Sequence, residues 1–294
     1  MSRAGQEFIG LLPTQDKRPK SHFSGPAGVS ALLRDQLTIQ TWLALGAVAQ
    51  AGAYAVVGYY AFLPAIAYLL LNAIETTVIT IGWKSNPYMD GVLSKKFSAQ
   101  IPDSQGNYGS KPASTDVVVF LIGTRSNHPL GALAPGFSTS GAYFQSMAKA
   151  LEDHAEEYGF LGMTSWLNSS DRSTKSEIMK VCYFRDVEGL HAFAHSKHHR
   201  EAWNWWNKNV KNMPHISIWH ETYHVPAGHY ESIYVNSHIS GINSTTYKIT
   251  DKETGETKWA SPVVDASKGL LKTSGGRMAR SHGQEHDAYG EDPY

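Results

Sequence analysis

The stretch "TDVVVFLIGT", residues 115–124, decides the fold. It is apolar and β-branched, which predicts a buried strand. Three further stretches predict strands: FLGMTSWLN (160–168), EIMKVCYF (177–184) and HISIWHETYHV (215–225). Two stretches with helical spacing, 137–159 and 187–207, separate them. The order strand, helix, strand, strand, helix, strand is typical of a ferredoxin-like βαββαβ domain. We therefore expect an α+β fold over residues 115–245, with a four-stranded antiparallel sheet and both helices on one face.

The second face of this sheet has no helix in the chain to cover it. A second copy of the chain, packed sheet against sheet, would bury that face. The sequence therefore predicts a homodimer of the dimeric α+β barrel type.

An apolar run precedes the domain. No charged residue occurs from Gln36 to Ile74, and one bilayer crossing takes about 20 apolar residues. The run is long enough for a two-helix transmembrane hairpin over residues 37–83, with spans near 38–57 and 61–82. Lysines and arginines flank both ends, which favours a cytosolic location for both termini and suits the endoplasmic reticulum. Glu75 lies near the end of the second span, where its carboxylate can reach the interface.

The remaining segments are predicted from their polarity. Residues 1–36 form a cytosolic N-terminal segment, in which 24–36 reads as a short amphipathic helix. Residues 84–114 contain prolines, glycines and charges, which predicts a linker. Residues 246–294 are polar and charged, which predicts a disordered or surface-draped tail.

The charge balance and the cysteine count exclude several classes of protein. There are 26 basic and 26 acidic residues, so no net charge attracts nucleic acid. The single cysteine, Cys182, excludes an intramolecular disulfide and a cysteine-rich zinc site.

Histidine and tryptophan concentrate in the second predicted helix, "LHAFAHSKHHREAWNWWN" (190–207). At about 100° per residue, several of them share one helix face. They are His191, His195, His198, His199, Trp205 and Trp206. Paired histidines suggest a metal, but the stretch lacks a carboxylate partner and an HExxH pattern, so we predict no metal site. Haem through His195, His198 or His199 stays open. For any single histidine, local hydrogen bonding within the helix is the simpler interpretation, whereas the whole face suggests the wall of a substrate cavity.

The fourth predicted strand and the end of the first add further candidates. Alternation points His220 to one face of the sheet and Trp219 and Tyr223 to the other. His220 and His199 are candidate general bases, because imidazole changes charge near neutral pH. Arg125 and Asn127, at the end of the first strand, could hold the polar end of a substrate. Ordinary structural roles are open for each: hydrogen bonding for His220, and capping of the sheet edge for Arg125.

Three motifs resemble those of one protein family. "VVVFLIGTRSN" (117–127), "FRDVEGLHAFAHSKHHREAW" (184–203) and "IWHETYHVPAGHYESIYVN" (218–236) are similar to the fungal dimeric α+β barrel, or antibiotic-biosynthesis-type, monooxygenases. The nearest branch carries an N-terminal hydrophobic segment, and one member is assigned polyene cleavage in fumagillin-type biosynthesis. The resemblance implies "WHETY" as a signature. It also places Trp203 where haem-degrading relatives carry the ligand histidine, which argues against that binding mode.

These observations lead to one hypothesis and two alternatives. We expect a membrane-anchored oxygenase that uses O₂, without a cofactor, on an apolar conjugated intermediate of fungal secondary metabolism. Its base would be His220 or His199, and its polar clamp Arg125 or Asn127. The side chains assigned to the substrate cavity are His191, His195, Trp205, Trp206, Trp219 and Tyr223. The alternatives are a haem-dependent lyase or dehydratase on the same fold, and a non-catalytic protein that binds a lipid-like ligand or scaffolds pathway enzymes.

Overall fold

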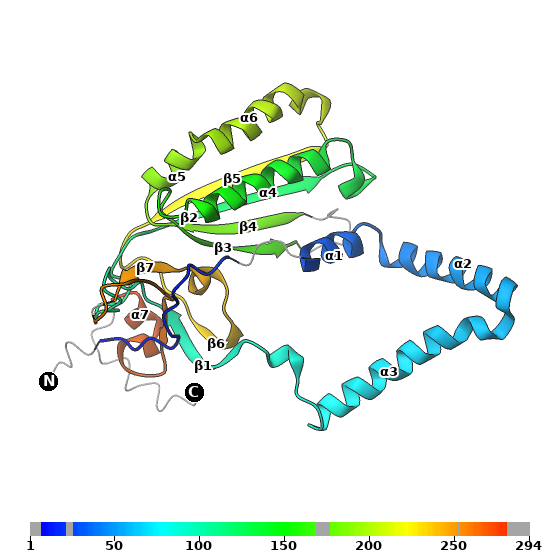
Figure 1. Cartoon of the computed structure of the whole chain (residues 1–294), viewed down its shortest axis with the longest axis horizontal. Helices are drawn as coiled ribbons and strands as arrows, with labels where there is room; N and C mark the ends of the chain where they lie inside the picture. The colour runs from blue at the N-terminus through cyan, green and yellow to red at the C-terminus, as the bar shows by residue number, and fades with distance from the viewer. Residues whose placement is uncertain (1–6, 22–25, 169–176, 252, 281–294) are drawn as a thin grey trace.

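The structure is a computed structural model that describes residues 7–21, 26–168, 177–251 and 253–280 (Figure 1). The predicted order of strands and helices is confirmed between residues 117 and 225. The elements are β2 (Val117–Ser126), α4 (Phe137–Asp153), β3 (Phe160–Leu167), β4 (Ile178–Phe184), α5 (Val187–Ala194), α6 (Lys197–Asn209) and β5 (Ile216–Val225). The strands lie in the order β3-β4-β2-β5, and every neighbouring pair is antiparallel. Helices α4, α5 and α6 lie over one face of this sheet (Figure 1).

The core of this domain lies where the helices meet the sheet. Its largest fully buried side chains include Phe184 on β4 and Met163 on β3. Ala148 and Leu151 from α4, and Leu190 and Phe193 from α5, cover them. The core therefore lies where α4 and α5 pack against the four-stranded sheet.

The predicted single helix over 187–207 is wrong, because the chain breaks at His195 and Ser196. Ser196 has an extended backbone (φ −67°, ψ 161°), and its Oγ accepts a hydrogen bond from the amide of His199 at 3.4 Å. Serine favours this N-cap geometry over a position inside a helix. Helix α5 thus ends at Ala194 and α6 begins at Lys197. The 100° spacing does not continue across the break, so the predicted histidine face is divided between two helices.

The predicted linker over 84–114 contains a strand instead. After the 3-10 turn η2 (Pro87–Met89) comes β1 (Val92–Ala99), which pairs with β6 (Tyr234–His238) and β9 (Val263–Asp265) in a second, three-stranded sheet. Phe97 and Ser98 on β1 are fully buried. Sequence patterns did not predict β1 for two reasons. The strand contains polar residues and two lysines, and its partner strands lie more than 100 residues further along the chain.

The predicted tail is also wrong up to residue 280. Strand β9 belongs to the three-stranded sheet, and β7 (Tyr247–Thr250) pairs with β8 (Thr257–Ala260). The 3-10 turns η6 (Gly241–Ser244) and η7 (Gly269–Lys272) and the short helix α7 (Ser274–Arg277) complete this part. Val263, Val264 and Ala266 are fully buried. Residues 281–294 lie outside the described residues.

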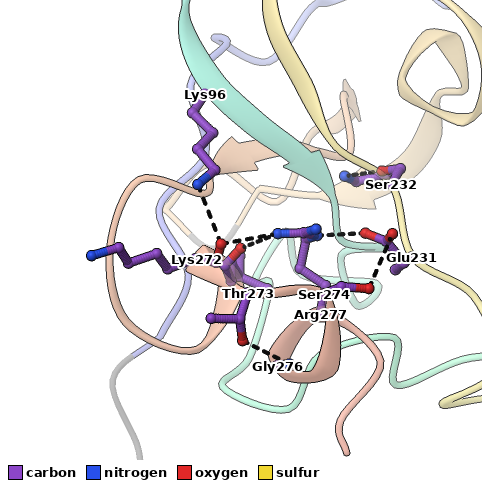
Figure 2. A network of polar contacts seen from close by, with 10 residues as sticks. Lys96, Glu231, Ser232, Lys272, Thr273, Ser274, Gly276 and Arg277 are labelled. Carbon is purple, nitrogen blue, oxygen red and sulfur yellow. Dashed lines mark hydrogen bonds and ion pairs between the residues drawn. The ribbon is translucent and has the colours of Figure 1, made fainter. Parts of the chain in front are cut away.

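Buried polar contacts fix this C-terminal segment in place (Figure 2). The Arg277 side chain is buried and donates to Glu231 at 2.5 Å and to the backbone oxygen of Leu271 at 2.9 Å. Lys96 on β1 donates to the backbone oxygen of Lys272 at 3.2 Å (Figure 2). A buried guanidinium with paired donors costs less than a bare one, so these contacts explain how a polar sequence folds here.

The N-terminal segment is folded as well. Gly10 bridges to Val264 and Gln15 to Trp259, and Arg18 forms an ion pair with Glu152 on α4. The short helix expected in 24–36 is present as α1 (Pro26–Asp35). Residues 7–21 therefore tie the C-terminal strands to the helical layer.

The apolar run forms α2 (Ile39–Val57), the 3-10 turn η1 (Gly58–Phe62) and α3 (Leu63–Thr80). Together, Ile39–Thr80 is one helical stretch that is long and apolar enough to cross a membrane, with a mean hydropathy of 1.7 over 18 residues. None of the residues of α2, η1 and α3 is buried, and the stretch projects away from both sheets (Figure 1). The Glu75 carboxylate forms an ion pair with Lys84 beyond its end.

Candidate active site

The register of the sheet decides which candidate residues can meet. Ile122 on β2 lies opposite His220 on β5 and opposite Lys180 on β4. Side chains of a strand alternate between faces, and paired residues point to the same face. Phe120 and Ile122 pack against the core under the helices. His220 and Lys180 therefore share the helix-facing side of the sheet with them.

Two imidazoles lie on this side. The His220 ring is 5.5 Å from the Phe120 ring, and the His199 ring is 6.0 Å from the Phe193 ring, between centroids. Burial lowers the pKa of His199, and the charges of His220 and His195 lower it further, against the raising effect of a hydrogen bond with the backbone of Ala194. His199 is half-buried and His220 exposed. A neutral His199 at physiological pH can accept a proton, which is what a general base must do.

Lys180 is a residue of this face that the sequence reasoning missed. Only 2% of it is exposed. Its Nζ donates to the Ser165 hydroxyl at 2.8 Å and lies 5.7 Å from the centroid of the Phe144 ring. The signal was visible in "EIMKVCYF", where alternation places this lysine on the same face as Ile178 and Cys182. A lysine on the buried face of a central strand is unusual, because charged side chains are almost never fully buried.

The side chains of this interface do not close it off from solvent. Phe120 and Ile122 lie on a central strand beneath helices, yet both remain partly exposed. Ser165 on the edge strand β3 is exposed. Solvent therefore reaches His220 and Ser165, whereas Lys180 between them is buried.

Two of the predicted tryptophans pack at one end of this layer. Trp205 and Trp206 contact a satellite apolar cluster that contains Phe137, Met213 and Ile216. The Trp205 ring also lies 5.1 Å from the Tyr143 ring of α4. Both indoles are half-buried, so they join α6 to α4 and to the start of β5.

Most of the remaining predicted residues are not brought to the imidazoles. His191 is exposed, because α5 turns Leu190 and Phe193 toward the core. His195 is exposed too, but it lies close enough to His199 for its charge to lower the pKa of His199. Asn127 is exposed in the loop after β2, and its backbone amide donates to the oxygen of His215 at 2.7 Å.

Arg125, Trp219 and Tyr223 point to the opposite face of the sheet. Arg125 lies 3.8 Å from Glu177. The Trp219 indole lies over Gly123, where a Cβ would come within 2.2 Å of the ring. The Tyr223 hydroxyl donates to Glu221 at 2.5 Å, and this contact raises the pKa of Tyr223. The structure thus separates the predicted polar clamp from both candidate bases.

No group of three or more histidine, cysteine, aspartate or glutamate side chains gathers in metal-binding geometry among the described residues. Cys182 is buried on β4, and burial raises the pKa of its thiol to about 12. The thiol therefore stays neutral.

The fold and this interface define an α+β protein with candidate acid–base residues between an antiparallel sheet and its helices. The family model described as "Monooxygenase af470-like" matches residues 117–242, which span β2 to η6. Monooxygenase af470 of Aspergillus fumigatus is 32% identical over 271 residues, which cover 92% of this chain and 96% of the relative. The chain belongs to the monooxygenase af470-like family, and it is therefore an oxidoreductase of the monooxygenase class.

Two solved structures show a distant similarity to part of the chain. SnoaB, a cofactor-independent oxygenase from Streptomyces nogalater, is 12% identical with a TM-score of 0.26, over 37% of this chain and 92% of its own. The aldoxime dehydratase OxdRE, in complex with butyraldoxime, is 12% identical with a TM-score of 0.36, over 43% of this chain and 36% of its own. The functional assignment rests on the family and not on these structures.

Proposed function

We propose that this protein is a membrane-anchored monooxygenase that oxidises an apolar, conjugated and enolisable intermediate of fungal secondary metabolism, with O₂ as co-substrate and no cofactor. The observation that carries the proposal is the pair His199 and His220 on the helix-facing side of the sheet. Burial keeps His199 neutral at physiological pH. The His199 ring lies beside Phe193, and the His220 ring lies beside Phe120.

The chemistry follows from this arrangement. The imidazole removes a proton from a carbon next to a conjugated carbonyl, and the resulting carbanion transfers its electron pair to O₂. A C–O bond forms, and the peroxide takes up a proton. Loss of water then turns the CH₂ group into a carbonyl, so that one oxygen atom enters the product and the other leaves as water. The protein contributes the base and an apolar, aromatic surface against which the substrate binds.

Oxygen uptake by the purified full-length chain in detergent tests the reaction. Anthrone serves as the probe, because it is an apolar, enolisable ketone with a CH₂ group between aromatic rings. We expect equimolar consumption of O₂ and formation of anthraquinone, above the rate of a His199→Ala/His220→Ala variant. Equal rates for the two proteins would contradict the proposal for this class of substrate.

Membrane attachment is proposed from the fully exposed apolar stretch Ile39–Thr80. Exposed apolar area of this extent is unfavourable in water, and the stretch would lie in the endoplasmic reticulum membrane as two spans with both termini cytosolic. Resistance to carbonate extraction tests the attachment, and glycosylation acceptor sites added at each terminus test the topology. The natural sequons at Asn168 and Asn243 should carry no glycan, because both would face the cytosol, and glycan on either would overturn this orientation.

A homodimer is proposed from the second face of the four-stranded sheet. Val119, Leu121 and Val181 on this face are only half-buried, and Trp166 is 48% exposed. A second copy would cover these apolar side chains. Sedimentation of the detergent-solubilised protein should give the mass of two chains, and a monomer at micromolar concentration would contradict this part.

The two alternative functions have different readouts. A haem-dependent lyase or dehydratase would show a Soret band after purification. Its ligand would be His198 or His199, which are half-buried, rather than the exposed His195. A non-catalytic binding protein would consume no O₂ with any enolisable substrate.

A further inference from the structure

A lysine side chain inside the sheet–helix layer is the strongest unexplained feature of the molecule. Lys180 comes from β4, next to the central strand β2, and points toward α4. Its neighbours on the same face of β4 are Ile178 and Cys182, the latter buried. Burying a lysine at such a position costs stability unless its amine is well bound. A side chain whose only role was packing would be better served by leucine or methionine.

The contacts of the Lys180 amine place it next to the edge strand β3. Lys180 Nζ donates to the hydroxyl of Ser165 at 2.8 Å, and the face of Phe144 lies 5.7 Å away. Ser165 is exposed on the edge strand β3. A ligand that displaces solvent at Ser165 would lie next to a buried lysine whose amine contacts include the Ser165 hydroxyl and the Phe144 ring.

We propose that Lys180 is a catalytic residue that binds the enolate oxygen of the substrate and stabilises the negative charge that forms there. The proposal rests on the proposed function, because it places the oxyanion partner opposite the imidazole base. Lys180 takes the role that the sequence analysis gave to Arg125 or Asn127, which lie elsewhere. A cation in an apolar layer acts on a developing charge more strongly than it would in water.

The electrostatics of the amine agree with this role. Burial lowers the pKa of Lys180 from 10.5 to about 8. The amine is thus mostly protonated at neutral pH and can donate a hydrogen bond to an oxyanion. Among the described residues, the titratable groups near this face include His220 across β2, His199 on α6, the neutral Cys182 thiol, and Glu152 on α4, whose charge acts on Cys182.

The distance between base and lysine limits the substrate. His220 and Lys180 stand on either side of Ile122, and strands lie about 4.8 Å apart, so their Cα atoms are separated by roughly 10 Å. The Lys180 amine points away from His220, toward β3. The proton to be removed and the carbonyl oxygen must therefore lie at separate ends of a conjugated system. We infer an extended enone, in which double bonds carry the charge from the deprotonated carbon to the oxygen.

The step balances with O₂ as the oxidant. The imidazole takes the proton from carbon, and the electron pair moves through the double bonds to the enolate oxygen held by Lys180. The pair then forms a C–O bond to O₂, and the peroxide anion takes a proton from the imidazolium. Lys180 keeps its proton throughout and acts by charge and hydrogen bonding.

Binding of a matched pair of probes tests the charge preference. 4-Hydroxycoumarin is a conjugated enol that is ionised at neutral pH, and 4-methoxycoumarin is its neutral ether. We expect the full-length chain in detergent to bind the enolate about tenfold or more tightly than the ether, followed by tryptophan fluorescence, since charge-assisted hydrogen bonds contribute about 1.5–3 kcal/mol. Lys180→Met should remove the preference while affinity for the ether stays unchanged. Equal binding of the two probes by the unaltered chain, or a preference retained in Lys180→Met, would overturn the proposal.

Controls separate this proposal from folding defects and from the proposed function. Lys149→Met removes an exposed lysine of α4 that pairs with Asp153, and it should keep the preference. Ser165→Ala, which leaves the lysine in place, should reduce the preference in part. 2-Naphthoate is the carboxylate comparison, and tighter binding of it than of the enolate would overturn the assignment to an enolate. If the chain oxidises anthrone but Lys180→Met does so at the same rate, the lysine role fails and the oxygenase stands. If the chain prefers the enolate but oxidises no substrate, the proposed binding site stands and the proposed oxygenase activity fails.

Discussion

The two faces of the four-stranded sheet carry different chemistry, although they are built from the same strands. The helix-facing side holds His220 and Lys180 beside aromatic rings, and His199 joins them from α6. The opposite side holds Trp219 over Gly123 and the Tyr223–Glu221 hydrogen bond. One residue of shift along a strand moves a side chain from one set to the other. The comparison teaches that closeness in sequence, as in "IWHETY", does not mean closeness in a site.

The largest expected effect comes from removing the base on the helix-facing side. The His199→Ala/His220→Ala variant should lose about 10²–10⁴-fold in kcat/KM for O₂ uptake with anthrone, the range that general base catalysis contributes. The two single variants show which imidazole is the base. His191→Ala on α5 is the matched control, because His191 is exposed, and it should retain full activity. A His191 variant as inactive as the double variant would break the distinction between these histidines.

On the opposite face, the largest effect should be on stability. Gly123→Ala places a methyl group where a Cβ would lie 2.2 Å from the Trp219 ring. The indole must move, and such overpacking costs about 1–3 kcal/mol, visible as a lower Tm in thermal unfolding. Activity per folded molecule should stay near that of the unaltered chain. Gly141→Ala, in α4 with no atom within 4 Å of its Cβ, should stabilise by about 0.5–1 kcal/mol, because glycine weakens a helix. Loss of activity without loss of stability in Gly123→Ala would place Trp219 in the reaction.

The pH profile of activity should show both ionisable groups of the helix-facing side. Activity needs a neutral imidazole and a charged lysine. It should therefore fall below pH 6.5, the ordinary pKa of histidine, at a position set by the lowered pKa of His199. It should fall again above the pKa of about 8 of Lys180. Lys180→Met should remove the alkaline limb and keep the acid limb. An unchanged alkaline limb would assign that ionisation to another group.

The same lysine predicts how stability changes with pH. Its pKa is about 8 in the folded chain, against an ordinary value of 10.5. Between these values the unfolded chain binds more protons than the folded chain, so the free energy of unfolding should rise with pH across this window. Chemical denaturation at pH 8 and pH 10 measures the rise. Subtraction of the same data for Lys180→Met isolates the contribution of the lysine from that of the tyrosines.

Local patterns predicted the domain and half of the site. Apolar runs and helical spacing predicted β2, β3, β4 and β5 and the helices between them, because each element is encoded by adjacent residues. Alternation also placed His220 on the opposite face of the sheet from Trp219 and Tyr223. The break at Ser196 was not predicted, since a serine cap competes with an otherwise continuous helical pattern. Strand β1 was missed because its partners, β6 and β9, are distant in sequence, and polar strands give weak local signals.

Lys180 was missed for a different reason. The alternation of Ile178, Lys180 and Cys182 was visible, but a single lysine in a strand is normally read as pointing to solvent. Only the register with Ile122 and the contact with Ser165 show that it is buried and close to a candidate base. A charged residue at a strand position where alternation predicts an apolar side chain is therefore the signal to look for in other sequences of this kind.

The smallest expected effect tests the comparison most sharply. Tyr223 was predicted to line the substrate cavity, yet it lies on the opposite face, is 50% exposed and donates to Glu221 at 2.5 Å. Tyr223→Phe removes only the hydroxyl, and an exposed hydrogen bond contributes little, so kcat/KM for O₂ uptake should stay within about twofold. Tyr143→Phe is the matched control on the helical side, where the Tyr143 ring contacts Trp205. A tenfold loss in Tyr223→Phe would mean that a partner subunit brings this face into the site, because within one chain the sheet separates it from His199 and Lys180. In that case the loss of activity in Tyr223→Phe should change with protein concentration, because dilution dissociates the dimer and separates Tyr223 from the site of the partner.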